Sequence, residues 1–225
     1  MKLLFSIIIL LLLLIIFSQV LIIRSTNKAE KRKFRVILKQ DNFEIRHYTD
    51  AILASVHIEG NTYQKVASPG FKKLAKYIFG ANQSHKNIAM TSPVEMSIND
   101  SLSQMSFTMP SDQTIESLPK PDDSKIQVHN TPAEYLAVLS FGGYSSDQKI
   151  KHYTSILKSL LDQKGIKYSN NFRYLGYNPP YQFIGRRNEI VVSIQYNESN
   201  KQNQETRRFN SPMQLFNSKM RRKHL

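Results

Sequence analysis

The chain begins with an almost unbroken run of apolar residues from Leu3 to Ile23. Of these 21 residues, 18 are apolar, and the exceptions are Ser6, Ser18 and Gln19. At about 1.5 Å per residue, a helix of this length crosses a hydrocarbon core of roughly 30 Å. The run therefore predicts an N-terminal transmembrane helix, and the rest of the chain must fold outside the hydrocarbon.

The residues around the ends of this run predict whether the helix is cleaved off and how it is oriented in the membrane. The segment from Phe17 to Arg24, FSQVLIIR, lacks the small residues that precede a signal-peptide cleavage site, so we expect an uncleaved anchor. Six basic residues lie between Arg24 and Arg35, whereas Lys2 alone precedes the run. Because basic flanks stay in the cytoplasm, the sequence predicts a single-pass membrane protein whose soluble domain is cytoplasmic.

Charge divides the chain into four parts. We expect a membrane anchor at residues 1–24, a basic neck at 25–35, one folded domain at 36–196 and a basic, flexible tail at 197–225. Of the net charge of +14, Lys2 contributes +1, Arg24 to Arg35 +5 and the tail +5, which leaves +3 for the folded domain. The domain is therefore only mildly basic, and we expect no nucleic acid as a partner.

The composition excludes several kinds of chemistry. The chain has no cysteine, which excludes disulfides, thiolate-bound zinc, iron–sulfur clusters and a thiol nucleophile. The sequence also lacks G-x-S-x-G, H-E-x-x-H and glycine-rich phosphate-binding motifs. We therefore identify no catalytic residues and do not expect an enzyme.

Hydrophobic periodicity predicts strands and two amphipathic helices in the domain. One helix is expected over residues 62–79, where Pro69 should kink it or restart it, and a second begins with a capping box formed by Ser145 and Gln148 and stops at Gly165. Strands are predicted at residues 43–48, 52–58, 88–98, 104–109, 125–129, 134–141, 172–177 and 189–196.

The same order of elements occurs twice. Strand, helix, strand, strand starts at Ile52 and again at Glu134, and LASVHIEG aligns with LAVLSFGG at an offset of 83 residues. This repetition predicts an α+β fold of two related halves whose sheets join, each with one packed helix. A cleft between such halves is a natural ligand site.

Six short motifs resemble those of the SOUL haem-binding protein family and occur in the same order. They are FEIRHY (43–48), IAMTSPVEM (88–96), FTMPS (107–111), LPKP (118–121), LAVLSFGG (136–143) and YNPPYQFIGRRNEI (177–190). The resemblance covers about residues 34–196. It implies a distorted β-barrel made from two strand-helix-strand-strand repeats and flanked by two long helices, to which this chain adds the N-terminal transmembrane helix. It also implies non-covalent binding of haem or a related tetrapyrrole.

A tetrapyrrole needs apolar contacts and bases for its propionates. Alternation places a methionine-rich set in phase on two adjoining strands, where flexible thioethers suit either a flat ligand or a protein core. The resemblance adds Lys76, which matches a lysine in the first helix of characterised members that is thought to meet a propionate. The predicted cofactor-binding residues are Met90, Met96, Met105, Phe107, Met109 and Lys76.

Other charged residues have more than one interpretation. Helical spacing of about 100° per residue turns Lys76 away from the apolar helix face, so it can meet a ligand only on the outer surface. Arg186 and Arg187 are interpreted as a clamp on carboxylates or carbonyl groups, with an anion site as the alternative. The six histidines show no metal-ligand spacing, and we assign no metal ligand.

Two further hypotheses concern function. One is a hydrolase of hydrophobic small molecules, suggested by similarity of the implied fold to gyrase-inhibitory-protein domains; it requires a buried carboxylate, for which Glu44 and Glu95 are the candidates. The other is an interaction protein whose tail binds acidic partners through Arg207, Arg208 and residues 221–223. The first hypothesis remains a binding domain whose partners are a hydrophobic small molecule and the membrane.

Overall fold

The computed structural model describes residues 1–40 and 42–196, so the predicted tail lies outside the described residues. Three helices are present in this part of the chain: α1 (Lys2–Lys28), α2 (Tyr63–Ile78) and α3 (Asp147–Gln163). Helix α1 is long and apolar enough to cross a membrane. The strands are β1 (Glu30–Lys31), β2 (Phe34–Lys39), β3 (Glu44–Tyr48), β4 (Ala51–Glu59), β5 (Thr91–Ser92), β6 (Val94–Ser97), β7 (Leu102–Thr108), β8 (Ile126–Thr131), β9 (Glu134–Gly142), β10 (Tyr168–Gly176) and β11 (Arg187–Ile194).

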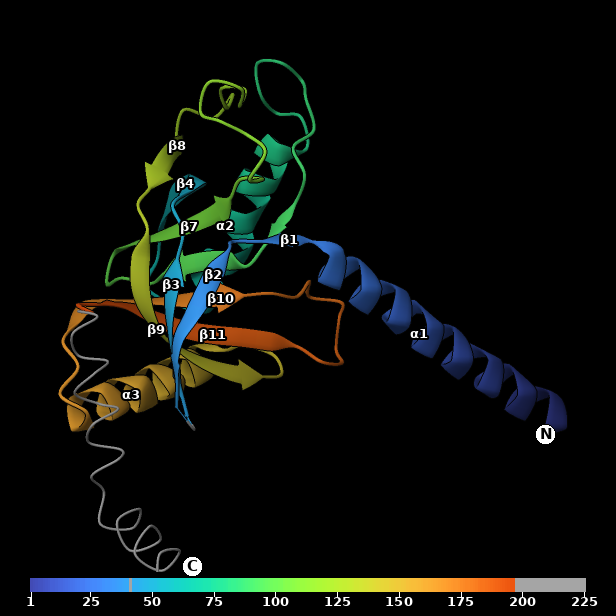
Figure 1. Cartoon of the computed structure of the whole chain (residues 1–225). Coiled ribbons are helices and arrows are strands. Elements are labelled where there is room, and N and C mark those ends of the chain that lie inside the picture. The colour runs from blue at the N-terminus through green and yellow to red at the C-terminus, as the bar shows by residue number, and fades with distance from the viewer. Residues whose placement is uncertain (41, 197–225) are drawn as a thin grey trace, which may run out of the picture. The chain divides into compact units, whose positions relative to one another are not determined.

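Nine strands form one curled sheet in the order β2-β3-β9-β11-β10-β6-β7-β4-β8 (Figure 1). The order is symmetric about the β10–β6 pair, because β9, β11 and β10 occupy in one half the places that β4, β7 and β6 hold in the other. Strands β4 and β9 also share the same sequence of buried and exposed positions. The predicted α+β fold of two joined repeats, curled into a distorted and open barrel, is confirmed.

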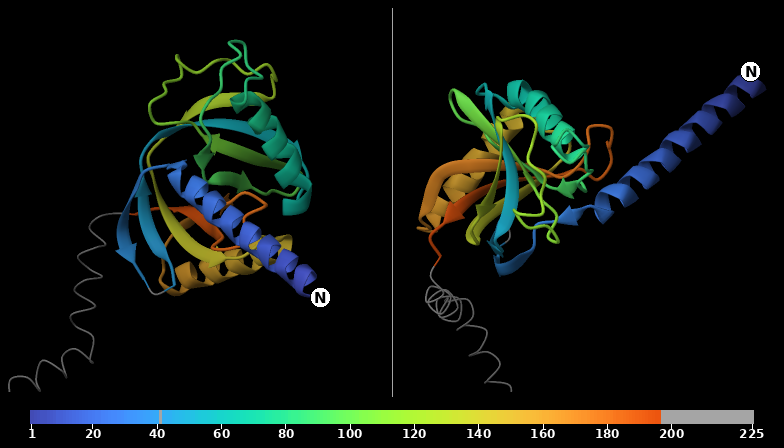
Figure 2. Two further views of the ribbon diagram at one scale, coloured as in Figure 1. Left: turned by 90° about the vertical axis from the view of Figure 1, so that its right-hand side faces the viewer. Right: turned by 90° about the horizontal axis from the view of Figure 1, so that it is seen from above.

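Helices α2 and α3 cover the same face of the sheet, one on each half (Figure 2). Helix α2 packs on β4 and β7, and α3 packs on β9, β10 and β11. The helices bury apolar residues at the spacing that predicted them: Val66, Leu74, Tyr77 and Ile78 from α2, and Leu157 and Leu161 from α3. The strand faces turned away from the helices line the inside of the curl.

The first helix begins where it was predicted, but one alternative for its course is excluded and the start of the second helix differs by one residue. Pro69 lies inside the continuous helix α2, whose N-cap is Thr62, so the chain does not restart at this proline. The N-cap of α3 is Ser146, which accepts a hydrogen bond from the Lys149 amide, so the capping box at Ser145 is wrong by one residue. The Ser145 hydroxyl instead lies 2.8 Å from the hydroxyl of Tyr174.

The strand predicted at residues 88–98 is shorter and divided. Pairing begins at β5, and Pro93 separates this two-residue strand from β6. Proline has no N–H to donate to a ladder, which explains the interruption. The hairpin predicted between this segment and β7 is present, since β6 and β7 pair antiparallel with Met96 opposite Met105.

Candidate ligand-binding site

Most of the predicted ligand residues lie between the sheet and α2. Four of them are only 1–4 % exposed: Met96, Met105, Phe107 and Met109. A Cβ atom added at Gly70 of α2 would lie 3.0 Å from the Met105 side chain, so the helix covers this residue closely. These four side chains form a core layer. Met105 and Phe107 lie under α2, so a ligand could touch them fully only if the helix moved away, whereas Met109 also lines the cavity described below. Met90, just before β5, is half-buried.

The outer surface of α2 combines exposed aromatic and basic side chains. Phe71 is 41 % exposed, and its ring centroid lies 5.4 Å from that of the buried Phe107. Lys72 and Lys76 are exposed one helical turn apart, and Phe79 at the C-cap is exposed as well. We call Phe71, Lys72, Lys76 and Phe79 the outer face of α2. The ammonium groups of Lys72 and Lys76 lie on one side of the helix, and Phe71, about 140° from Lys76 around the axis, forms the flank of this surface that rests on the core layer.

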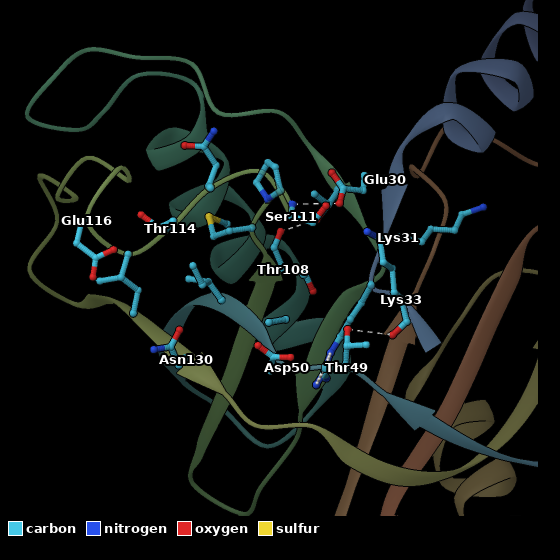
Figure 3. A pocket seen from close by; sticks show the side chains of 18 residues that line it. Glu30, Lys31, Lys33, Thr49, Asp50, Thr108, Ser111, Thr114, Glu116 and Asn130 are labelled. Carbon is cyan, nitrogen blue, oxygen red and sulfur yellow. Dashed lines mark hydrogen bonds between the residues drawn. The ribbon is translucent and has the colours of Figure 1, made fainter. Parts of the chain in front are cut away.

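A separate cavity of about 340 Å³ lies between the neck, β4 and the segment that follows β7 (Figure 3). Met109 and Ile52 contribute to its apolar part. Its rim carries both signs of charge, from Lys31, Lys33, Asp50 and Glu116 (Figure 3). The volume is near the lower end of the range of about 300–1,000 Å³ for small-molecule pockets. A cavity this small suits a flat macrocycle less well than the outer face of α2.

Inside the curl of the sheet, Glu189 is fully buried within a cluster of charged and polar groups. Its carboxylate accepts hydrogen bonds from Arg46 at 3.0 and 3.1 Å, from Arg187 at 2.6 Å and from the Tyr177 hydroxyl at 2.6 Å. Ser140 donates a further bond at 3.1 Å. We call Arg46, Tyr177, Arg187 and Glu189 the inner ionic cluster.

Electrostatics keep this carboxylate ionised. Burial by itself would raise the pKa of Glu189, but the guanidinium groups of Arg46 and Arg187 outweigh it, and the pKa lies below its ordinary value. The same burial, together with the adjacent negative charge, raises the pKa of the Tyr177 hydroxyl well above its ordinary range. The cluster is therefore a paired structural unit that joins β3, β11 and the residue after β10.

The two predicted carboxylate candidates also belong to ion pairs. Glu44 lies 2.7 Å from Arg46. Glu95 lies 3.2 Å from Arg173, which also pairs with Glu134 at 2.8 Å. Burial raises the pKa of Glu134, but hydrogen bonding and charge from Arg173 reverse the direction and lower it. Each candidate carboxylate is thus half-buried and engaged by a guanidinium group.

Arg186, just before β11, and Arg187, its first residue, form the predicted clamp. Arg186 donates to the carbonyl oxygens of Asn178, Pro179 and Gln182. Its guanidinium carbon lies 4.3 Å from the ring centroid of Tyr144. Arg187 binds the Glu189 carboxylate, so both arginines hold carbonyls or a carboxylate as this interpretation predicted.

Within the described part of the chain, no group of three or more His, Asp or Glu side chains is arranged to hold a metal ion. His129 lies 3.0 Å from the Ser55 hydroxyl, and His47 packs its ring against Tyr135 at 4.5 Å. His57 and His152 are exposed on β4 and α3. Helix α2 itself contains no histidine, so its outer face offers no imidazole ligand for iron.

Comparison with known proteins identifies the family. The model of the family described as SOUL heme-binding protein matches residues 29–193, which is most of the chain. The chain belongs to the SOUL haem-binding protein family. "Heme-binding protein 2" of Homo sapiens is 32 % identical over 171 residues, covering 72 % of this chain and 82 % of that protein. "Heme-binding protein 1" of Xenopus laevis is 30 % identical over 155 residues, covering 66 % and 81 %.

Solved structures support the fold of this SOUL family member. The crystal structure of the EcmrR C-terminal domain superimposes with a TM-score of 0.53 at 10 % identity, covering 69 % of this chain and 98 % of that one. An uncharacterized conserved protein from Listeria innocua gives 0.51 at 11 % identity, covering 76 % and 95 %. Both identities are low, so these structures are similar in fold alone.

Proposed function

We propose that this SOUL family member binds haem or a related tetrapyrrole non-covalently on the outer face of α2. The observation that carries the proposal is the exposed pair of Phe71 and Lys76 on one helix, within a domain that belongs to a haem-binding family. Phe71 presents a large apolar ring to solvent although it rests on Phe107, and an apolar macrocycle would cover it.

The groups on this face match the parts of such a ligand. The ring of Phe71 would stack against the macrocycle, and the ammonium groups of Lys72 and Lys76 would meet the two propionates. Met105 and Phe107 would act from below, by holding Gly70 and Phe71 in place. When bound, haem would supply its iron for ligand binding or redox chemistry, and the chain's role would be to hold the porphyrin edge and face.

A binding role fits the carboxylates better than hydrolysis does. A general base that activates water needs a pKa near the working pH, whereas the neighbouring arginines hold the pKa of Glu189 below its ordinary value. Glu44 and Glu95 are likewise paired with Arg46 and Arg173. We therefore propose a ligand-binding protein, without a catalytic residue, whose domain corresponds to residues 36–196.

The proposal also includes the membrane. Helix α1 would act as an anchor at residues 1–24, joined by the basic neck at 25–35, with the domain held on the cytoplasmic side. What supports the orientation is the excess of basic residues after the helix. Protease protection of the intact membrane protein, with the mass of its N-terminal peptide, tests anchoring and orientation together.

Titration with haemin tests the ligand. The full chain in lipid nanodiscs, measured against empty nanodiscs, should give a saturable Soret shift with one site. Lys76→Gln should weaken binding by roughly fivefold, because an exposed ion pair contributes about 1 kcal/mol. Lys151→Gln, which removes an exposed lysine from α3, is the matched control and should leave the affinity unchanged. Equal effects of the two variants, or a shift no larger than an unrelated basic protein gives, would contradict the proposal.

A further inference from the structure

The loop between β10 and β11, residues 177–186, exposes large apolar side chains. Tyr181, Phe183 and Ile184 are 65 %, 50 % and 52 % exposed, whereas Tyr177 and Gln182 of the same loop are buried. Three such neighbours on one loop form an apolar surface rather than scattered single residues. This loop does not include the outer face of α2, and the proposed haem site does not use it.

Most carbonyl groups of this loop accept hydrogen bonds from within the protein. From Asn178 to Ile184, six of the seven carbonyl groups accept a bond from a side chain of the protein. Pro179 and Pro180 carry no N–H group at all. A loop in water can leave such groups to solvent, whereas a loop in hydrocarbon must satisfy them within the protein. Most carbonyl groups of this loop are thus paired internally, while its large apolar side chains are exposed.

One of these bonding partners comes from the membrane-spanning helix. Gln19 of α1 is 4 % exposed, and its side-chain amide donates to the Tyr181 carbonyl at 3.1 Å. The same side chain accepts from the Phe183 amide at 3.2 Å. Further along α1, the Thr26 hydroxyl donates to the Gln182 side chain at 3.0 Å. A glutamine in an apolar run is costly unless paired, and here the loop backbone pairs both ends of its amide group.

The position of Gln19 gives the depth of the contact. Gln19 lies four positions before Ile23, the last residue of the apolar run. This spacing corresponds to about 6 Å along a helix. Apolar faces that lie in a membrane interface are buried by roughly 5–10 Å. Arg24 and Lys28 follow at the level of the lipid headgroups, and tyrosine is a favoured residue at this boundary.

We infer that the β10–β11 loop inserts Tyr181, Phe183 and Ile184 into the lipid interface beside α1. The occupant of this apolar surface is the bilayer, because the loop is hydrogen-bonded to the span itself. The inference rests on the proposed membrane anchoring by α1 and is independent of the haem ligand. It gives the domain a second attachment, which would hold it in one orientation on the membrane surface.

Single tryptophan reporters test this inference, since the sequence contains no tryptophan. Phe183→Trp is placed in the full chain in nanodiscs whose lipids carry bromine near the headgroup end of the acyl chains. Its emission should fall by at least half. Leu102→Trp, on an apolar side chain of β7 that is 47 % exposed, is the matched control and should keep its emission. Leu12→Trp, in the middle of α1, reports whether the anchor itself is in the bilayer, and for this variant the lipids carry bromine near the ends of the acyl chains.

The outcomes separate the two hypotheses. Quenching at position 12 but not at 183 would overturn loop insertion and leave the anchor in place, whereas no quenching at either position would overturn the anchor. Blue-shifted but unquenched emission at position 183 means that protein, such as a second copy, covers the loop, and it overturns the inference as well. Adding Gln19→Leu to Phe183→Trp should abolish most of the quenching at position 183. Adding Gln19→Leu to Leu12→Trp should leave the quenching at position 12 unchanged.

Discussion

Replacing Glu189 with leucine should cause one of the largest losses of stability in the domain. The side chain is fully buried, and the Arg46 side chain that it pairs with is only 4 % exposed. Removing one partner of a buried pair leaves the other charge uncompensated and costs about 3–5 kcal/mol. Glu44 remains 2.7 Å from Arg46, which favours the lower part of that range, but the Tyr177 hydroxyl loses its acceptor. We expect a net loss of about 4 kcal/mol.

A double variant distinguishes an unpaired charge from lost packing. Replacing a whole buried pair by apolar residues of similar volume is often neutral or stabilising. Arg46→Met combined with Glu189→Leu should therefore be more stable than Glu189→Leu alone. Urea unfolding of the chain in mild detergent, followed by tyrosine circular dichroism, gives both free energies. A cost below about 1 kcal/mol for Glu189→Leu, or a double variant less stable than the single one, would refute the reasoning.

Three further predictions concern stability. Burial and the charge of Glu189 raise the pKa of Tyr177 in the folded state, so the native protein keeps this proton to higher pH than the unfolded chain does. The free energy of unfolding should therefore fall as the pH rises above about 10. Tyr177→Phe should make that fall smaller, as measured by urea midpoints at several pH values. Gly70→Ala should lower the free energy of unfolding by about 1–3 kcal/mol, although alanine favours helices, because the new Cβ would lie 3.0 Å from the Met105 side chain. A higher melting temperature would contradict this packing. Ser146→Ala should lower the free energy of unfolding by about 1 kcal/mol because it removes the N-cap of α3, whereas Gln148→Ala should change it little. A larger loss for Gln148→Ala than for Ser146→Ala would support the capping box predicted from the sequence.

The fold was predictable because its signals are local. Alternation along β4 and β9 shows which residues face one side of a strand, and the offset of 83 residues repeats that pattern in the second half. The caps were less predictable, since Ser145 and Ser146 are adjacent and equally able to accept a hydrogen bond. The choice depends on Tyr174, which engages Ser145 from a distant strand.

The site was predictable only in part, because alternation does not reveal what covers a strand face. Met96 and Met105 are in phase as expected, yet α2 lies over them and makes them a core layer. Glu189 was not recognised as a buried carboxylate, since its partner Arg46 lies 143 residues earlier in the chain. The apolar residues IVVSI that follow it were the one available sign that this glutamate enters a buried strand.

Gln19 shows the same limit in the membrane segment. In the sequence it is one of three polar residues in an apolar run, and the run predicts a span with or without it. Its role becomes visible only when Tyr181 and Phe183, more than 160 residues later, are placed beside it. Contacts between distant segments are set by the tertiary fold, so no spacing rule could have indicated this pair.

The most direct test of the central claim is to locate haemin on the surface. The chain has no cysteine, so a fluorine tag can be attached to one introduced cysteine at a time. The tag sites are Ser68→Cys on α2, one turn before Lys72, Asn130→Cys at the cavity of Figure 3, and Lys151→Cys on α3. Paramagnetic haemin should broaden the tag at position 68 beyond detection and leave the other two sharp, while a diamagnetic porphyrin should broaden none. Loss of the tag signal at position 130 with a sharp signal at position 68 would place the ligand in the cavity and contradict the account.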